Sequence, residues 1–190
     1  MPDLLDIPDG TSVFVDTNIF HYHFQNKSRA CTAFLDRIKR GDVEAYVNTQ
    51  VLSDLLHKLM LSESFEKQCY IAKKPNHDGL KNYLRHLHNN PSVISKLIDY
   101  QQQFESILSI GVRILPINKT LLRTTKSERQ TWHLMAGDSI HLGTMNRYKV
   151  PLQHIATHDN DFDHITDLTI WKPLDISKSV PTRQKNHAHT

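Results

Sequence analysis

The sequence predicts an α/β protein in which a parallel sheet is covered on both faces by helices. Short apolar runs typical of buried strands alternate with longer segments of helical spacing over residues 12–171. Strands that alternate with helices in this way form parallel sheets whose two faces are both covered. Four aspartates also lie at or near the predicted strand ends, and open parallel sheets form their sites beyond the carboxyl ends of the strands.

The first half of the chain follows this alternation closely. Val13, Phe14 and Val15 are an unbroken run of strand-forming residues, and Ser28 and Gly41 are suited to begin and end a helix. The predicted elements are, in order, a strand over 12–16, a helix starting at Thr17 and Asn18, a helix from a Ser28 cap to Gly41, a strand over 44–48 and a helix capped by Thr49.

The second half contains an interruption before the alternation resumes. Helical spacing over 80–87 is followed by a long helix that Asn90 and Pro91 open and Gly111 ends. The later elements are a strand over 112–115, a helix from Lys119, a polar loop through Gln130, a helix around Asp138 and strands over 154–157 and 168–171. We therefore expect one domain over 1–176 with a helical insertion at about 63–109, and a flexible polar tail over 177–190.

Bulk composition narrows the class without naming a function. The chain has 190 residues and a formal charge of +3, which permits nucleic-acid binding without demanding it. Cys31 and Cys69 have no metal-binding or disulfide spacing, which fits a reducing cytoplasm. No signal peptide or membrane-length apolar run is present, and the 13 histidines show no structural zinc spacing.

Four aspartates fall where the predicted sheet would bring them together. Asp16 ends the first strand, Asp161 follows the fourth, Asp54 lies early in the helix after the second, and Asp138 lies in the helix before the fourth. Carboxylate oxygens are hard ligands suited to Mg²⁺ or Mn²⁺. Several at one spot repel one another unless cations neutralise them or some stay protonated. The pattern therefore predicts metal-assisted chemistry on phosphates.

The segments around these acids resemble the PIN-domain family of metal-dependent nucleases. They are Val13–Asn18, Thr49–Leu55, Gly137–Ile140 and Ile155–Phe162, in the family's order. The resemblance implies an α/β/α sandwich with a central, mostly parallel sheet of four to five strands. It also implies RNA cleavage through Mg²⁺ or Mn²⁺. The family's second acid is usually Glu, whereas this chain has Asp54.

The resemblance assigns roles to individual residues. Asp16, Asp54, Asp138 and Asp161 are the expected catalytic residues, with Asp16, Asp138 and Asp161 binding the metal. Asp54 would complete a second metal site or orient the attacking water, and one ion or two are both open. Asp159 is as near the strand end as Asp161, and is the alternative ligand, directly or through water.

Four neighbours of the acids are expected to support them. We expect Thr17 and Asn18 to hold the turn at Asp16 by hydrogen bonding backbone groups. Thr157 either hydrogen bonds a metal-bound water or merely ends a strand, and Ser139 has the same two readings.

Basic residues in the insertion suggest a surface for RNA. They are Lys73, Lys74, Lys81, Arg85 and Lys96. Contacts to phosphates and stacking of bases would use them together with nearby tyrosines, although a solvated helical face is the commoner cause of such a pattern. The apolar stripe through Leu97 and Phe104 packs on its own domain or on a second copy of the chain.

Three functions compete on this evidence. The first is an endoribonuclease, and many small VapC-like members of the resembled family are toxins with an antitoxin protein as partner. The second is a PIN-like module that binds RNA or protein with little or no catalysis. The third is a phosphatase-like hydrolase of small molecules, which would need a closed pocket around the acids.

Overall fold

A parallel sheet forms the middle of the molecule. The computed structural model describes residues 1–67, 84–85, 87–148 and 152–176, and within them the sheet has five strands in the order β3-β2-β1-β4-β5. The strands are β1 (Ser12–Val15), β2 (Glu44–Asn48), β3 (Arg113–Leu115), β4 (His154–Ala156) and β5 (Thr169–Trp171). All neighbouring pairs are parallel, so the predicted sheet is confirmed.

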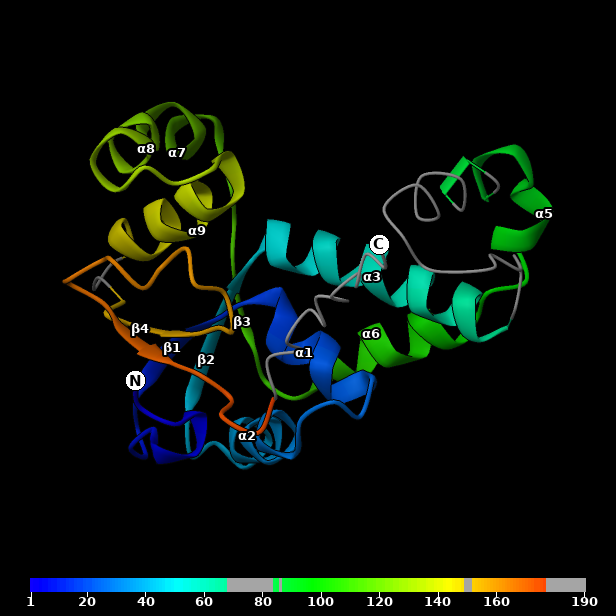
Figure 1. Ribbon diagram of the computed structural model, residues 1–190, viewed down its shortest axis with the longest axis horizontal. Helices are drawn as coiled ribbons and strands as arrows, with labels where there is room; N and C mark the ends of the chain where they lie inside the picture. Colours follow the sequence, from blue (N-terminus) through cyan, green and yellow to red (C-terminus); the bar gives the residue numbers. More distant parts are fainter. Residues whose placement is uncertain (68–83, 86, 149–151, 177–190) are drawn as a thin grey trace, which may run out of the picture.

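Helices cover the sheet on both sides. They are α1 (Thr17–Phe24), α2 (Arg29–Arg40), α3 (Thr49–Glu66), α5 (Pro91–Ile94), α6 (Asp99–Ser109), α7 (Lys119–Thr124), α8 (Lys126–Trp132) and α9 (Ala136–Asn146), with a short 3-10 helix η1 (Leu4–Asp6). Figure 1 shows α9 on one side of the sheet with α7 and α8 beyond it, and α1 and α2 on the other. The α/β/α sandwich is thus confirmed.

One pair of helices extends away from the sheet. α3 and α6 pack side by side, and α5 lies beyond their outer ends (Figure 1). The division into one domain with an insertion at about 63–109 stays a prediction, and the predicted tail lies outside the described residues. Among the helices described, none has the length and apolar character needed to cross a membrane.

The central strand β1 places the first acid. Val13, Phe14 and Val15 are fully buried because β1 lies between β2 and β4 and is covered on both faces. The next residue, Asp16, donates its backbone N–H to the Ala156 carbonyl at 3.0 Å. Asp16 therefore leaves the sheet beside the end of β4.

The predicted ends of α2 are confirmed, whereas the predicted cap of α3 is wrong. Ser28 accepts a hydrogen bond from the Cys31 N–H at 3.0 Å and begins α2, and Gly41 ends it in the left-handed conformation at φ +81°. Thr49, however, is not the cap of α3. Asn48 holds that position and accepts from the Val51 N–H at 3.0 Å, so Thr49 is the first helical residue.

The predicted polar loop before Gln130 is wrong, because residues 126–132 form α8. This helix contacts α9 through polar groups. Because its buried side is polar, its sequence lacks the apolar spacing that would predict a helix. Its buried Glu128 accepts from the Arg147 guanidinium at 2.5 Å. Gly143 of α9 makes the close approach possible, because a Cβ there would lie 2.5 Å from Thr125 Cγ2.

The predicted long helix from Pro91 to Gly111 is also wrong, because it is broken into α5 and α6. The break depends on Glu63 of α3, whose side chain is 4% exposed. Its two carboxylate oxygens accept backbone N–H groups of Ile98 and Tyr100, each at 2.8 Å. A buried carboxylate thus supplies acceptors to the first N–H groups of α6, where a helix has no internal partners for them.

The same carboxylate is strongly acidic. Burial alone would raise the pKa of Glu63, but hydrogen bonds from Lys67 and from the backbone at Tyr100, Ile98 and Asp99 lower it from 4.5 to about 2. A carboxyl group whose pKa is depressed by folding stabilises the protein fully above its unfolded pKa. That contribution is lost as the pH falls from about 4.5 toward 2.

We expect Glu63→Gln to lower the free energy of unfolding at pH 7 by about 2 kcal/mol, the scale of hydrogen bonds to a charged group. The difference from wild type should shrink as the pH falls through 4.5 toward 2. Urea unfolding at a series of pH values measures both effects. Glu66→Gln is the matched control, because Glu66 lies exposed on the same helix. Equal losses in the two variants would contradict the capping role of Glu63.

Candidate functional site

The Asp16 carboxylate is the centre of a hydrogen-bond network at the carboxyl edge of the sheet. Its Oδ2 accepts from the Thr157 hydroxyl at 2.6 Å and from the Asn18 side-chain amide at 2.5 Å. Although Asp16 is the residue before α1, its side chain makes no capping hydrogen bond. The carboxylate is therefore not a helix cap, and within the described chain its Oδ1 has no hydrogen-bond partner.

Asn18 and Thr157 join the end of β1 to the end of β4. Asn18 donates to Thr157 Oγ1 at 3.1 Å and accepts from the His158 backbone N–H at 3.0 Å. The Thr157 hydroxyl also accepts from the Asp159 N–H at 3.0 Å, so this fully buried group is saturated. Asn18 thus contacts both backbone and side chains around Asp16, and Thr157 does more than end a strand.

The loop after β4 carries two further acids and is held at several points. The Asp161 N–H donates to Asp159 Oδ1 at 3.0 Å. Buried Lys172, next to β5, donates to Asn160 at 2.8 Å and pairs with Asp163 at 2.6 Å. These contacts present the exposed carboxylates of Asp159 and Asp161 at the same edge as Asp16.

The charges of the neighbouring acids change the pKa of Asp138. It is half-buried in the first turn of α9, and its pKa is raised from 3.8 to about 6. Burial is the largest cause, and the charges of Asp159, Asp161 and Asp16 follow in that order. We call Asp16, Asp138, Asp159 and Asp161 the acid cluster. Such mutual repulsion is what a bound cation would relieve.

The fourth predicted acid, Asp54, lies at the border of the cluster. It is exposed on α3, and its charge acts on the buried ring of His141 together with that of Asp16. Burial lowers the pKa of His141, and these two carboxylates oppose the shift. Asp54 is not among the causes that raise the pKa of Asp138.

The acid cluster matches a hard cation in the kind of its donors and in its place on the sheet. Within residues 1–67, 84–85, 87–148 and 152–176, however, no three His, Cys, Asp or Glu side chains are gathered so that they could hold one ion. Asp16 keeps one oxygen free of hydrogen bonds, and Asp159 and Asp161 are exposed on a loop. Side-chain rotation is therefore needed before these acids can share a metal.

Thr17 and Ser139 contact the protein rather than the open edge. The buried Thr17 hydroxyl donates to the Val51 carbonyl of α3 at 3.3 Å, which ties α1 to the helix that carries Asp54. Ser139 donates to the Ala136 carbonyl at 2.8 Å and accepts from the Arg129 guanidinium at 3.2 Å. Both hydroxyls hold the backbone around the acids.

Most of the residues predicted to bind RNA lie outside the part of the chain that the structure describes. Lys73, Lys74 and Lys81 lie outside the described residues. Arg85 and Lys96 are exposed, and Lys96 follows α5, which Figure 1 places at the end of the α3–α6 pair remote from the sheet. Contact between these residues and RNA stays a prediction.

Several residues near the acids were not predicted from the sequence. Tyr22 lies one turn after Asn18 on α1, and its ring meets that of His158 edge-on at 5.6 Å. Its pKa is raised by burial first, and then by Cys31, Asp16 and Asp159. The four-residue spacing from Asn18 was the available signal for Tyr22, because it places both residues on one helix face.

Arg129 lies on α8, where the sequence predicts a loop, and is therefore not among the predicted site residues. It is half-buried on α8 and donates to Thr125 Oγ1 at 3.0 Å as well as to Ser139, the neighbour of Asp138. In the described part of the chain no acid pairs with Arg129. The Arg129 guanidinium donates to two hydroxyls beside the half-buried Asp138, and its positive charge remains available for another anion.

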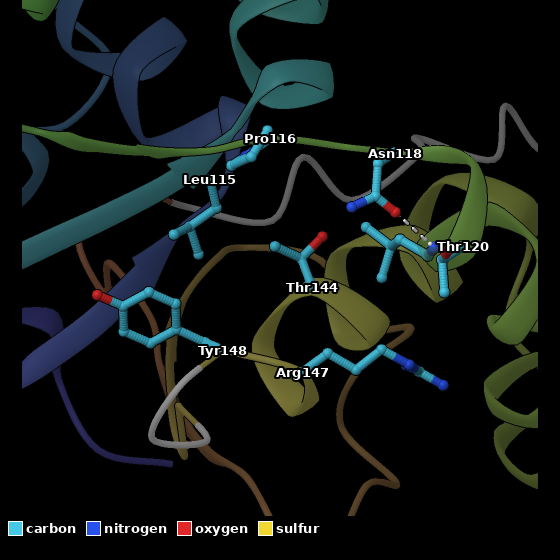
Figure 2. A pocket seen from close by; sticks show the side chains of 8 residues that line it. Leu115, Pro116, Asn118, Thr120, Thr144, Arg147 and Tyr148 are labelled. Atoms are coloured by element: carbon cyan, nitrogen blue, oxygen red, sulfur yellow. Dashed lines mark hydrogen bonds between the residues drawn. The ribbon is translucent and has the colours of Figure 1, made fainter.

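A hollow of about 300 Å³ lies apart from the acids, between the end of β3 and helices α7 and α9 (Figure 2). It is lined by Leu115, Pro116, Asn118, Thr120, Leu121, Thr144, Arg147 and Tyr148. In Figure 2 Asn118 turns back to accept from the Leu121 N–H, at 2.9 Å. None of the acids lines this hollow, so it lends no support to a small-molecule hydrolase.

The fold and the acidic sheet edge define an α/β domain of the nuclease type, and the sequence comparison agrees. The family model of the PIN domain matches residues 13–168. That range includes all the predicted acids and covers most of the chain. The protein therefore belongs to the PIN-domain family.

A comparison with solved structures finds the same fold. One similar structure is that of VapBC2 from Rickettsia felis bound to a DNA fragment from their promoter. The alignment has a TM-score of 0.51 and 12% sequence identity, and it covers 85% of this chain and 98% of the other. At that identity the match shows a shared fold alone. No curated protein matches the sequence.

We expect Thr157→Val to destabilise the protein by about 1–3 kcal/mol, because it removes a buried hydroxyl and leaves partners unsatisfied. Denaturant unfolding measures the loss. Thr166→Val is the control, since Thr166 is an exposed threonine whose hydroxyl, among the described residues, makes a single 3.4 Å contact with its neighbour Asp167. Similar stability of the two variants would contradict the view that Thr157 joins β4 to Asp16.

Proposed function

We propose that the protein is a metal-dependent endoribonuclease that hydrolyses RNA phosphodiester bonds through its acid cluster. The observation that carries the proposal is the coupling of Asp138 to Asp16, Asp159 and Asp161 at the carboxyl edge of a PIN fold. PIN domains are generally nucleases that use divalent metal ions, and a group of acids at this edge is the donor set that such ions require.

Asp16, Asp138 and Asp161 are the proposed ligands of a Mg²⁺ or Mn²⁺ ion, with Asp159 as a further ligand. A divalent ion bound there would supply a water of lowered pKa and stabilise charge on a phosphate. Residues of the chain itself hold one of the proposed ligands in position. Thr157 and Asn18 fix the Asp16 carboxylate, and the free Asp16 oxygen remains for a ligand.

Asp54 has a different proposed role. Its carboxylate is exposed and lies outside the set of charges that raise the pKa of Asp138. A carboxylate at the border of a site is suited to orient a water or to complete a second ion's coordination. We assign Asp54 to this catalytic but peripheral position.

A toxin of a toxin–antitoxin pair is the proposed biological setting. It is supported by the likeness to the fold of VapBC2 from Rickettsia felis. The partner would then be an antitoxin protein that covers the acidic edge. Co-purification with the product of an adjacent small reading frame, followed by loss of RNA cleavage in the complex, tests this setting.

A second candidate is a PIN-like module that binds RNA or protein without efficient catalysis. One observation favours it: in the described residues no three ligand side chains are gathered for an ion. The two candidates differ in the response to metal. Binding of RNA that is unchanged by EDTA, with no cleavage, would select the module.

We expect Asp16→Asn to lower the cleavage rate by roughly a hundredfold or more, the scale of losing one electrostatic group at a catalytic site. The fold should persist, since the asparagine oxygen can still accept from Thr157 and Asn18. Cleavage of a labelled RNA oligonucleotide is measured with Mn²⁺, Mg²⁺ or EDTA. Asp36→Asn, an exposed acid of α2, is the control. Full activity in EDTA, or in the Asp16 variant, would exclude the metal-nuclease proposal.

Arg129 is the residue we propose to hold a phosphate of the substrate next to the acids. A charge-assisted hydrogen bond to a charged group contributes about 1.5–3 kcal/mol, so Arg129→Ala should weaken RNA binding about tenfold. The salt dependence should also fall, with a slope change of about 0.7 for one contact to a single strand. Fluorescence anisotropy in the Asp16→Asn background measures both quantities without cleavage.

Arg123→Ala is the matched control for Arg129, because Arg123 is an exposed arginine on the preceding helix α7. If both variants weaken RNA binding equally, the effect is one of general charge and Arg129 has no special place. Urea unfolding of the Arg129 variant checks that the α8–α9 contact is retained.

A further inference from the structure

An aromatic pair lies beside the acid cluster. Tyr22 of α1 and His158 of the loop after β4 meet edge-on, with their ring centroids 5.6 Å apart and their ring planes at 81°. The hydroxyl oxygen of Tyr22 lies 3.4 Å from His158 Nδ1. The two residues are 136 positions apart along the chain, so the fold brings them together. We call these two residues the aromatic pair.

Hydrogen bonds fix the aromatic pair next to Asp16. Tyr22 lies one turn after Asn18 on α1, and the side-chain oxygen of Asn18 accepts the His158 backbone N–H at 3.0 Å. The residue before His158 is Thr157, whose hydroxyl donates to the Asp16 carboxylate at 2.6 Å. Asn18 donates to the same carboxylate, so the residues that hold Asp16 also hold the aromatic pair.

An edge-on contact leaves most of the aromatic surface of the pair uncovered by the pair itself. One ring presents its rim and keeps both faces, and the other ring uses one of its two faces. Tyr22 and His158 are both half-buried, so both residues reach solvent. Flat aromatic surface of this kind is what an unstacked nucleobase binds in proteins that recognise single strands.

The rings are held in place without a ligand. Tyr22 packs against the hydrophobic core, and its carbonyl accepts the Lys27 N–H at 2.9 Å. His158 is held by its backbone hydrogen bond to Asn18 and by its contact with the Tyr22 hydroxyl. Side chains that are already ordered lose little conformational freedom when a ligand binds, and this favours affinity.

The charge of the surroundings selects which part of a nucleotide this surface receives. After burial, which is the largest cause, Cys31 and the carboxylates of Asp16 and Asp159 raise the pKa of Tyr22. A phosphate beside these two carboxylates would be repelled. A base carries no charge and offers a π face, so the base is the part that suits the aromatic pair.

We propose that Tyr22 and His158 stack a base of single-stranded RNA next to the acid cluster, and that the aromatic pair thereby selects unpaired nucleotides for cleavage. This inference rests on the proposed function, because it names the substrate class of the same site. Bases of a duplex are already stacked, whereas loops, ends and single strands can offer a base to an aromatic side chain. Stacking is tolerant of sequence, so the aromatic pair selects strandedness and not base identity.

The first test compares a single-stranded RNA of mixed sequence with an abasic ribose–phosphate chain of equal length. Fluorescence anisotropy in the Asp16→Asn background measures the binding of both without cleavage. His158→Leu should weaken binding of the RNA about tenfold, the scale of one lost base–aromatic contact, and should leave binding of the abasic chain unchanged. His158→Phe keeps an aromatic ring and should retain most of the affinity. Equal losses on the two chains overturn the proposal.

His164→Leu is the matched control, because His164 is an exposed histidine of the same loop and its ring contacts Trp132. This variant should bind both chains as the Asp16→Asn protein does. Tyr22→Leu should resemble His158→Leu, and Tyr22→Phe should keep the affinity because the ring remains. Unfolding curves establish that each variant is folded.

The second test replaces the abasic chain by a duplex of the same sequence. The Asp16→Asn protein should bind the single strand at least about tenfold more tightly than the duplex, because the duplex offers no free base. His158→Leu should narrow this ratio. Equal affinity of the Asp16→Asn protein for strand and duplex overturns the proposal.

The outcomes separate this inference from the proposed function. If wild type cleaves no RNA but the loss in His158→Leu falls on the RNA and spares the abasic chain, the aromatic pair stands and the nuclease proposal fails. If wild type cleaves RNA and His158→Leu leaves the binding of both chains unchanged, the role of the aromatic pair is overturned. Absence of RNA binding and of RNA cleavage overturns both.

Discussion

The hydrogen bond from Thr157 to Asp16 is the interaction on which the candidate site depends. It crosses from the end of β4 to the end of β1, and it fixes the carboxylate that follows the central strand of the sheet. The same hydroxyl accepts the Asp159 N–H, so one buried group positions acids from two segments. The repulsion among the acids is opposed by this link together with the Asn18–His158 hydrogen bond and the contacts of Lys172 to the β4 loop.

The close approach of the acids in this arrangement affects the pKa of Asp138 most. Its pKa of about 6 means that, without a cation, a substantial fraction of this side chain is protonated just below neutral pH. Asp16 is the acid that accepts two short hydrogen bonds from its neighbours. The site thus combines one carboxylate fixed by its neighbours with one whose pKa is raised to about 6, so that a metal ion bound at Asp138, as we propose, would compete with a proton.

The sequence predicts the strands and the four acids because both depend on local patterns, namely apolar runs and acids at strand ends. Residues that act through long-range polar contacts were not predictable in this way. Arg129 contacts Ser139 because α8 packs on α9, and the sequence does not predict α8 because its buried residue is the polar Glu128. The break between α5 and α6 depends on Glu63, which is 35 residues away from Ile98 along the chain. Such partners are set by the fold, and no spacing rule within one segment reveals them.

The position of Asp54 depends both on the local sequence and on long-range packing. Val51, Leu55 and Leu59 bury the inner face of α3 almost completely, so the helix cannot shift toward the acids to compensate for a side chain one methylene shorter than Glu. In our proposal Asp54 therefore acts from the border of the acid cluster, where it orients a water or completes a second ion's coordination.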